Sequence, residues 1–169
     1  MKNLELRIFS ELLKNSDRSD RELAKTLGTS QPTISRTIKK MKEEGAIKEH
    51  TIIPDFKKLG IELLAITFGV WAPEKIKEYP ERERVEKAKK FLSDHPNAIF
   101  ASSGQGLGKG RVVITLHKNY TDYVEFMRQA KSEWAGLVNL ESFIISLETD
   151  VAPLPFSFRN LGKYLEKIS

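Results

Sequence analysis

Asp20 to Gly45 reads DRELAKTLGTSQPTISRTIKKMKEEG, and its small and apolar residues are spaced for two helices that cross around a tight turn. Ile34, Ile38 and Met41 recur at the spacing that lines one face of a helix. Gly28 stands where the first helix of the pair must end, a position that often needs a positive φ and therefore favours glycine. The stretch predicts a helix-turn-helix.

The second helix of this pair has a marked start and a polar outer face. Thr29 or Ser30 can cap it with a side-chain oxygen, and Pro32 suits its first turn. When the apolar side faces inward, the outer side carries basic and hydroxyl groups. Such a helix fits the major groove of double-stranded DNA, where Arg binds guanine and Gln binds adenine through two hydrogen bonds. The alternative is a charged face that is only solvated, as on any small helical domain.

The residues predicted to bind DNA fall into two groups. Those expected at base edges are Gln31, Thr33 and Arg36, and those expected at phosphates are Arg21, Lys39, Lys40 and Lys48. The hydroxyl residues Ser30 and Ser35 complete the predicted interface.

Length, charge and composition set limits on the protein class. The 169 residues suit one or two small domains, and most of the net charge of +5 lies in residues 1–60, which hold 13 basic and 9 acidic residues. The chain has no cysteine, which excludes a disulfide framework and a thiolate metal site. We predict a soluble cytoplasmic protein with no signal peptide and no membrane partner, because the longest apolar run, near 61–72, is interrupted and short.

The remaining periodicity predicts a βαββαβ unit after the helix-turn-helix. An amphipathic helix precedes the pair at residues 4–13, and residues 46–60 read as an extended piece followed by a turn and a short helical turn. Strands are expected at 63–71, 98–103, 112–116 and 138–147, and helices at 81–94 and 123–134. The fold class is therefore α+β, with a winged helix-turn-helix joined to a ferredoxin-like domain. Because its helices cover one face of the sheet, we expect dimerisation through the other face.

The C-terminal tail is a separate expectation. Pro153 and Pro155 are predicted to break structure before a short amphipathic helix that carries Leu161, Tyr164, Leu165 and Ile168. This helix is expected to pack on its own domain or on a neighbouring subunit. The predicted divisions are 1–46 for the DNA-binding domain, 47–60 for a linker strand and turn, 61–149 for the effector and dimerisation domain, and 150–169 for the tail.

Taken in order, these pieces resemble the Lrp/AsnC family of leucine-responsive, or feast/famine, transcription regulators. The resemblance covers about residues 4–148 and rests on RIFSELL, ELAKTLGTSQPTISRTIKKMKEEGAIK, IIPDFKKLG and SSGQGLGKGRVVITLH. It implies a regulator that reads a palindromic operator as a dimer or a higher homo-oligomer, and whose second domain senses a small-molecule effector. It also implies that residues 47–53 pair with the same strand of a second subunit.

One turn departs from the family pattern. The family usually has a glycine, two further residues and then an aspartate here, whereas this chain has no acidic residue at that position. Amino-acid binding therefore loses its counter-charge for the ammonium group, and an anion is the alternative. The candidate effector residues are Gly104, Gln105, Gly106, Lys109 and Arg111. A flexible hairpin that binds nothing is the other interpretation.

Two other functions are alternatives to gene regulation. A nucleoid-organising protein would coat DNA with little sequence preference, through a higher oligomer. The siroheme decarboxylases resemble these regulators in architecture, but their tryptophan-proline-tyrosine-asparagine stretch is absent. The three histidines have no partner at metal-ligand spacing, and no nucleophile has a flanking signature. We therefore predict no enzymatic activity, catalytic residue, metal or cofactor.

Overall fold

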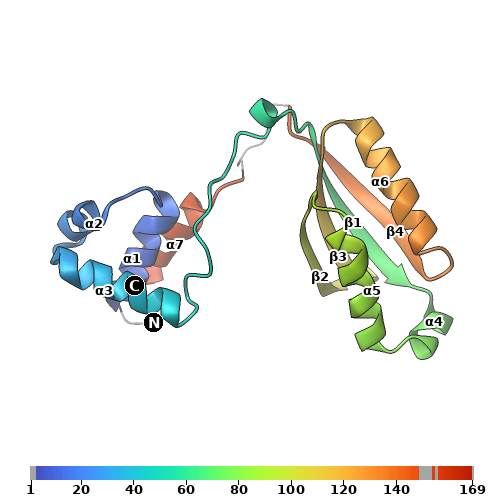
Figure 1. Ribbon diagram of the computed structural model, residues 1–169, viewed down its shortest axis with the longest axis horizontal. Coiled ribbons are helices and arrows are strands. Elements are labelled where there is room, and N and C mark those ends of the chain that lie inside the picture. The colour runs from blue at the N-terminus through green and yellow to red at the C-terminus, as the bar shows by residue number, and fades with distance from the viewer. Residues whose placement is uncertain (1–2, 149–153, 155, 169) are drawn as a thin grey trace. The chain divides into compact units, whose positions relative to one another are not determined.

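The structure is a computed structural model that describes residues 3–148, 154 and 156–168 (Figure 1). The chain divides into two compact units, of which the first contains residues 1–53 and 152–169 and the second contains residues 54–151. Over the ranges that the structure describes, each helix is too short or too polar to cross a membrane.

The first unit is built around the predicted helix-turn-helix. Its helices are α1 (Asn3–Lys14), α2 (Asp20–Leu27) and α3 (Gln31–Glu43). Their shared core contains Ile8, Leu23, Ala24, Leu27, Ile34 and Met41, and Ile38 packs against it. The inward positions predicted from the periodicity of α3, which are Ile34, Ile38 and Met41, are therefore confirmed.

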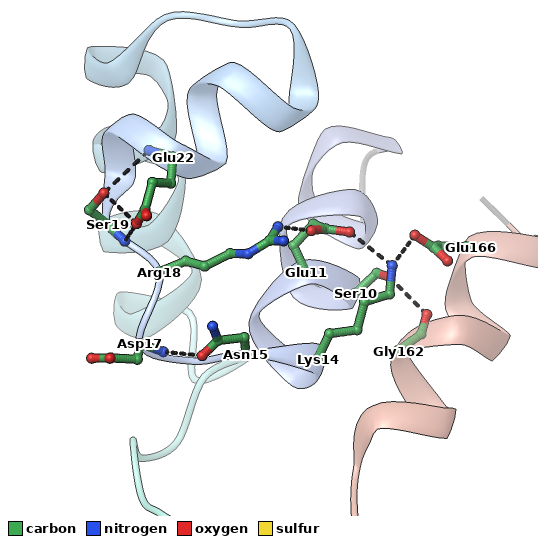
Figure 2. A network of polar contacts seen from close by, with 10 residues as sticks. All are labelled: Ser10, Glu11, Lys14, Asn15, Asp17, Arg18, Ser19, Glu22, Gly162 and Glu166. Carbon is green, nitrogen blue, oxygen red and sulfur yellow. Dashed lines mark hydrogen bonds and ion pairs between the residues drawn. The ribbon is translucent and has the colours of Figure 1, made fainter.

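The tail helix α7 (Arg159–Ile168) packs on α1 (Figure 1). Ser10 is buried, and its hydroxyl donates a hydrogen bond to the carbonyl of Gly162 at 2.8 Å. A Cβ atom at Gly162 would lie only 2.7 Å from the Ser10 carbonyl oxygen, so the two backbones meet where glycine leaves room. Lys14 binds Glu11 at 2.9 Å and also binds Glu166 of α7, as Figure 2 shows. The predicted tail helix is thus a further helix of the first unit.

Two of the predictions for the tail and the linker concern features outside the described part of this one chain. Pro153 and Pro155 lie outside the described residues. Residues 47–53 form no strand within this copy, and their predicted strand partner belongs to a second copy. The short helical turn η1 (Lys57–Leu59) ends at Gly60, whose φ of 68° is the left-handed value expected at such an end.

In the described part of the second unit, a four-stranded antiparallel sheet has the order β2-β3-β1-β4. The strands are β1 (Leu63–Trp71), β2 (Ala98–Gly106), β3 (Lys109–His117) and β4 (Val138–Ser146). The helices α5 (Glu81–Ser93) and α6 (Tyr120–Glu133) lie on the same side of the sheet, which confirms the ferredoxin-like prediction (Figure 1). The short helix α4 (Pro73–Glu78) was not predicted.

Alternation along the strands separates a helix-covered face from an open face. In β1, Ala65, Thr67, Gly69 and Trp71 are buried towards the helices. Trp71 and Trp134 meet edge to face with ring centroids 6.0 Å apart, and Ala130 of α6 completes this core. The intervening residues of β1 point to the open face.

His117 at the end of β3 is expected to make the second unit less stable in mild acid. Burial lowers the pKa of its imidazole from the ordinary 6.5, although Asp122, with Oδ2 at 3.4 Å from Nδ1, acts in the opposite sense. As pH falls through 6.5, the unfolded chain binds a proton that the folded protein does not, so stability is complete above this pH and decreases below it.

The effect is measured by thermal unfolding between pH 8 and pH 5. His117→Gln should unfold more easily overall, because it disturbs the 2.8 Å bond to Thr115 Oγ1, but its curve should depend less on pH. His50→Gln, which changes an exposed histidine of the first unit, is the control and should keep the wild-type profile. Equal pH profiles for all three proteins would contradict this assignment.

Candidate DNA interface

The turn between α2 and α3 is fixed by local interactions that the sequence dictates. Ser19 and Glu22 form a capping box at the start of α2, in which each side chain bonds the backbone N–H of the other residue. Gly28 ends α2 in the left-handed conformation with φ 65°. Because residues with a Cβ are disfavoured at this φ, glycine fixes the change of direction between the helices.

The start of α3 carries a cap that occupies two of the predicted DNA-binding residues. The Ser30 hydroxyl accepts a hydrogen bond from the Thr33 backbone N–H and lies 2.8 Å from the Thr33 hydroxyl. Thr33 is half-buried, whereas Ser30 is exposed. Both hydroxyls therefore help to begin the helix and remain at its N-terminal end, where backbone N–H groups and the helix dipole favour a phosphate.

The outer face of α3 is free in the single chain. Ile34 is fully buried and Met41 is 1% exposed, so both point into the core. Gln31, Ser35, Arg36 and Lys39 are exposed. Arg36 makes a long hydrogen bond, 3.4 Å from Nε to the Pro32 carbonyl. This face thus offers an amide, a hydroxyl and two cationic side chains to a ligand.

Lys40 differs from the other predicted phosphate contacts because it also holds α3 to α1. Its ammonium lies 2.7 Å from Oε1 of Glu5, a buried residue, and 3.5 Å from Oε1 of Glu44. The hydrogen bond that Lys40 donates to Glu5 raises the pKa of Lys40, and the Glu44 charge adds to the effect. The role of Glu5 was not predicted, because its signal in the sequence is no more than an acidic residue in the first turn of an amphipathic helix.

The remaining cationic candidates also belong to the first unit. Arg21 lies in the first turn of α2 and Lys48 follows α3, and both are exposed. Lys39 is 78% exposed and lies 3.9 Å from the Glu43 carboxylate, a distance that leaves its charge available to a phosphate.

The candidate effector residues lie along the β2–β3 hairpin in the second unit. Gly104, Gln105 and Gly106 are exposed, and the turn places Leu107 and Gly108 at φ 52° and 67°. Lys109 forms an ion pair with Glu141 at 2.6 Å. Arg111 donates to Ser103 and pairs with Gly69 in the register, which places it on the helix-covered face.

Comparison with known proteins gives relatives along most of the chain. A family model described as winged helix-turn-helix DNA-binding matches residues 1–48. An HTH-type transcriptional regulator of Pyrococcus furiosus is 40% identical over 77% of this chain and 81% of its own length. The HTH-type transcriptional regulator LrpC of Bacillus subtilis is 32% identical over 57% of this chain and 61% of its own length.

Solved structures share the fold at lower identity. E. coli AsnC superposes with a TM-score of 0.71 at 19% identity and covers 91% of this chain and 97% of its own. The transcriptional regulator NMB0573 from Neisseria meningitidis, solved as a complex with L-Met, gives a TM-score of 0.75 at 12% identity, over 95% of this chain and 99% of its own.

Proposed function

Because the chain belongs to the Lrp/AsnC family of helix-turn-helix transcriptional regulators, we propose that it reads a palindromic operator as a dimer, with α3 of each copy in a major groove. The observation that carries this proposal is the polar outer face of α3, which is exposed while Ile34 and Met41 fix the opposite side in the core. A helix held in this way presents one unchanging set of side chains to base edges.

The roles of individual residues follow from where they lie on the first unit. Arg36, Gln31 and Thr33 contact base edges, and the cations of Arg21, Lys39, Lys40 and Lys48 contact phosphates. Ser30 and Ser35 add hydroxyl contacts beside them. The N-terminal ends of α2 and α3 bring backbone N–H groups to the DNA backbone.

The open face of the sheet supports the dimer. By register it carries Leu64, Ile66 and Phe68 of β1, Val112, Ile114 and Leu116 of β3, Phe100 of β2, and Phe143 and Ile145 of β4. Phe100 and Phe143 are 51% and 65% exposed in the single chain. The same register places Ser102, Asn139 and Glu141 on this face as its polar residues. A largely apolar sheet face of this kind is typical of an interface, and a second copy supplies a matching one.

Regulation is assigned to the second unit. A small-molecule effector bound there would change how the two copies present α3, and the protein would act without catalysing a reaction. As a regulator of transcription it works at the chromosome, in the cytoplasm. The glycine-rich β2–β3 hairpin supports this assignment, because its exposed backbone offers N–H groups to an anion.

The proposal is tested by selecting bound fragments from genomic DNA, sequencing them and footprinting the recovered sites. We expect discrete half-sites separated by about 34 Å or a multiple of that distance, because one face of the duplex recurs once per turn. Continuous protection that spreads with protein concentration would favour a nucleoid-organising role instead. Absence of binding even at low salt would contradict the proposal, since phosphate contacts are strongest there.

A further inference from the structure

A trough of about 330 Å³ lies between α5 and the helix-covered face of the sheet. Its α5 wall includes Arg84, Ala88 and Phe91, and its sheet wall includes Thr67, Arg111 and Val113. All 13 residues of α5 are described, and none of them is buried, whereas α6 buries Phe126, Met127 and Ala130. The trough therefore exists because α5 packs less closely on the sheet than α6 does, and its volume falls in the range of small-molecule sites.

Charge in the trough has one sign. Among the described residues that line it, Arg84, Lys89 and Arg111 are basic and none is acidic. The Nε atom of Arg84 is buried and has no hydrogen-bond partner within the described chain, while the guanidinium lies 5.4 Å from the ring centroid of Trp71. A buried donor without an acceptor costs free energy, so an anion at this point would be stabilised.

The two arginines lie at the same end of the trough. Arg111 pairs with Gly69 in the sheet, and Gly69 and Trp71 are alternate residues on one face of β1, about 7 Å apart. Arg84 reaches this end through its contact with Trp71. A single carboxylate between them could therefore accept hydrogen bonds from both guanidinium groups.

Most of the remaining lining is apolar and includes Phe91, Leu92 and Val113, with Leu140 across Gly69 from Arg111. Besides Lys89, the polar residues there are Thr67, Ser102 and Ser103. We propose that the α5 trough binds a monocarboxylate with an apolar body, held by Arg84 and Arg111. An α-amino acid fits less well, because its ammonium group would find no carboxylate among the described lining residues. This proposal names a ligand class for the small-molecule regulation proposed above. It rests on that regulation for its biological role, whereas binding in the trough can be tested independently.

The chain carries its own reporter for this site. Its two tryptophans, Trp71 and Trp134, both line the trough. Titration of the full-length protein should therefore change tryptophan fluorescence, with calorimetry as a second measurement. The probes are isocaproate, leucine, which adds an ammonium group to the same skeleton, and isocaproamide, which lacks the negative charge. We expect saturable isocaproate binding, and binding at least about tenfold weaker for the other two.

Variants of the lining residues test whether isocaproate binds in the trough. Arg84→Gln should weaken isocaproate binding by about tenfold or more, and Ala88→Leu, which narrows the space, should do the same. Arg82→Gln changes an exposed arginine on the same helix that does not line the trough, and should bind as the wild type does. Circular dichroism reports folding, and Arg111→Gln replaces Arg84→Gln if that variant unfolds.

The outcomes separate this inference from the proposed function. Failure of isocaproate to bind, equal binding of leucine or isocaproamide, or unchanged binding by folded Arg84→Gln and Arg111→Gln would each overturn the inference. Operator binding is measured on the same ligand-free protein. If operator binding persists while the ligand result is negative, the inference fails and the regulator proposal stands.

Discussion

Replacing Phe143 by Glu is expected to convert the proposed dimer into monomers and to lower operator affinity by about 100-fold or more. Phe143 is 65% exposed at the open face of the sheet, opposite Ile66 of β1, so the substitution places a charge in the middle of the proposed interface. A monomer binds one half-site at a time. It therefore loses the gain in affinity that a dimer obtains, because binding of one α3 raises the effective concentration of the other at the second half-site. Sedimentation gives the oligomeric state, and fluorescence anisotropy gives the affinity.

Tyr120→Glu is the matched control for Phe143→Glu. Tyr120 is an exposed aromatic residue of the same unit, 63% exposed at the start of α6 on the helix side of the sheet. It should leave both the dimer and the operator affinity unchanged. A Phe143→Glu protein that is folded and still dimeric would show that the open face is not the interface.

Replacing Gly162 by Ala is expected to destabilise the first unit by about 1–3 kcal/mol, the usual cost of overpacking a close contact. The added Cβ would lie 2.7 Å from the Ser10 carbonyl oxygen, which is backbone and can move only with α1. In a helix without this contact, the same change would be stabilising by about 1 kcal/mol, because glycine is a poor helix former. The sign of the change in the free energy of unfolding therefore shows whether α7 packs on α1.

Hydrogen–deuterium exchange of the full chain locates the effect. Amides of α1 and α7 should exchange faster in Gly162→Ala, while those of the sheet should not change. Lys163→Ala changes the adjacent exposed residue of α7 and serves as the control, with exchange like that of the wild type. Increased stability in Gly162→Ala would contradict the packing of α7 on α1.

Local patterns predicted most of the elements. The bounds of β1 agree with the prediction, because an apolar run that contains Ile66, Thr67 and Val70 lies between the turn residues Gly60 and Pro73. The two hairpin strands are longer than predicted. The glycines between residues 104 and 110 are typical of a loop, but β2 extends to Gly106 and β3 begins at Lys109. Helix α4 has only six residues, too few to show a helical period.

Contacts between distant residues could not be predicted in the same way. Ser10 and Gly162 are 152 positions apart, and a glycine in a short helix looks like a weakness until the facing backbone is known. Lys40 and Glu5 are 35 positions apart, so the dual role of Lys40 was hidden. The exposure of the outer face of α3 was predictable, because it follows from the helical period of its buried residues alone.

The exposed face of α3 is proposed to read bases, and the direct test is the affinity of Arg36→Ala and Lys39→Ala for an operator and its single-base variants. Lys39 replaces Lys40 as the phosphate probe, because Lys40 also neutralises the buried Glu5. Arg36→Ala should lose about 1–3 kcal/mol and its preference at one base-pair position, whereas Lys39→Ala should weaken all sequences alike and reduce the salt slope by about 1. The same loss at every position for both variants would contradict the claim.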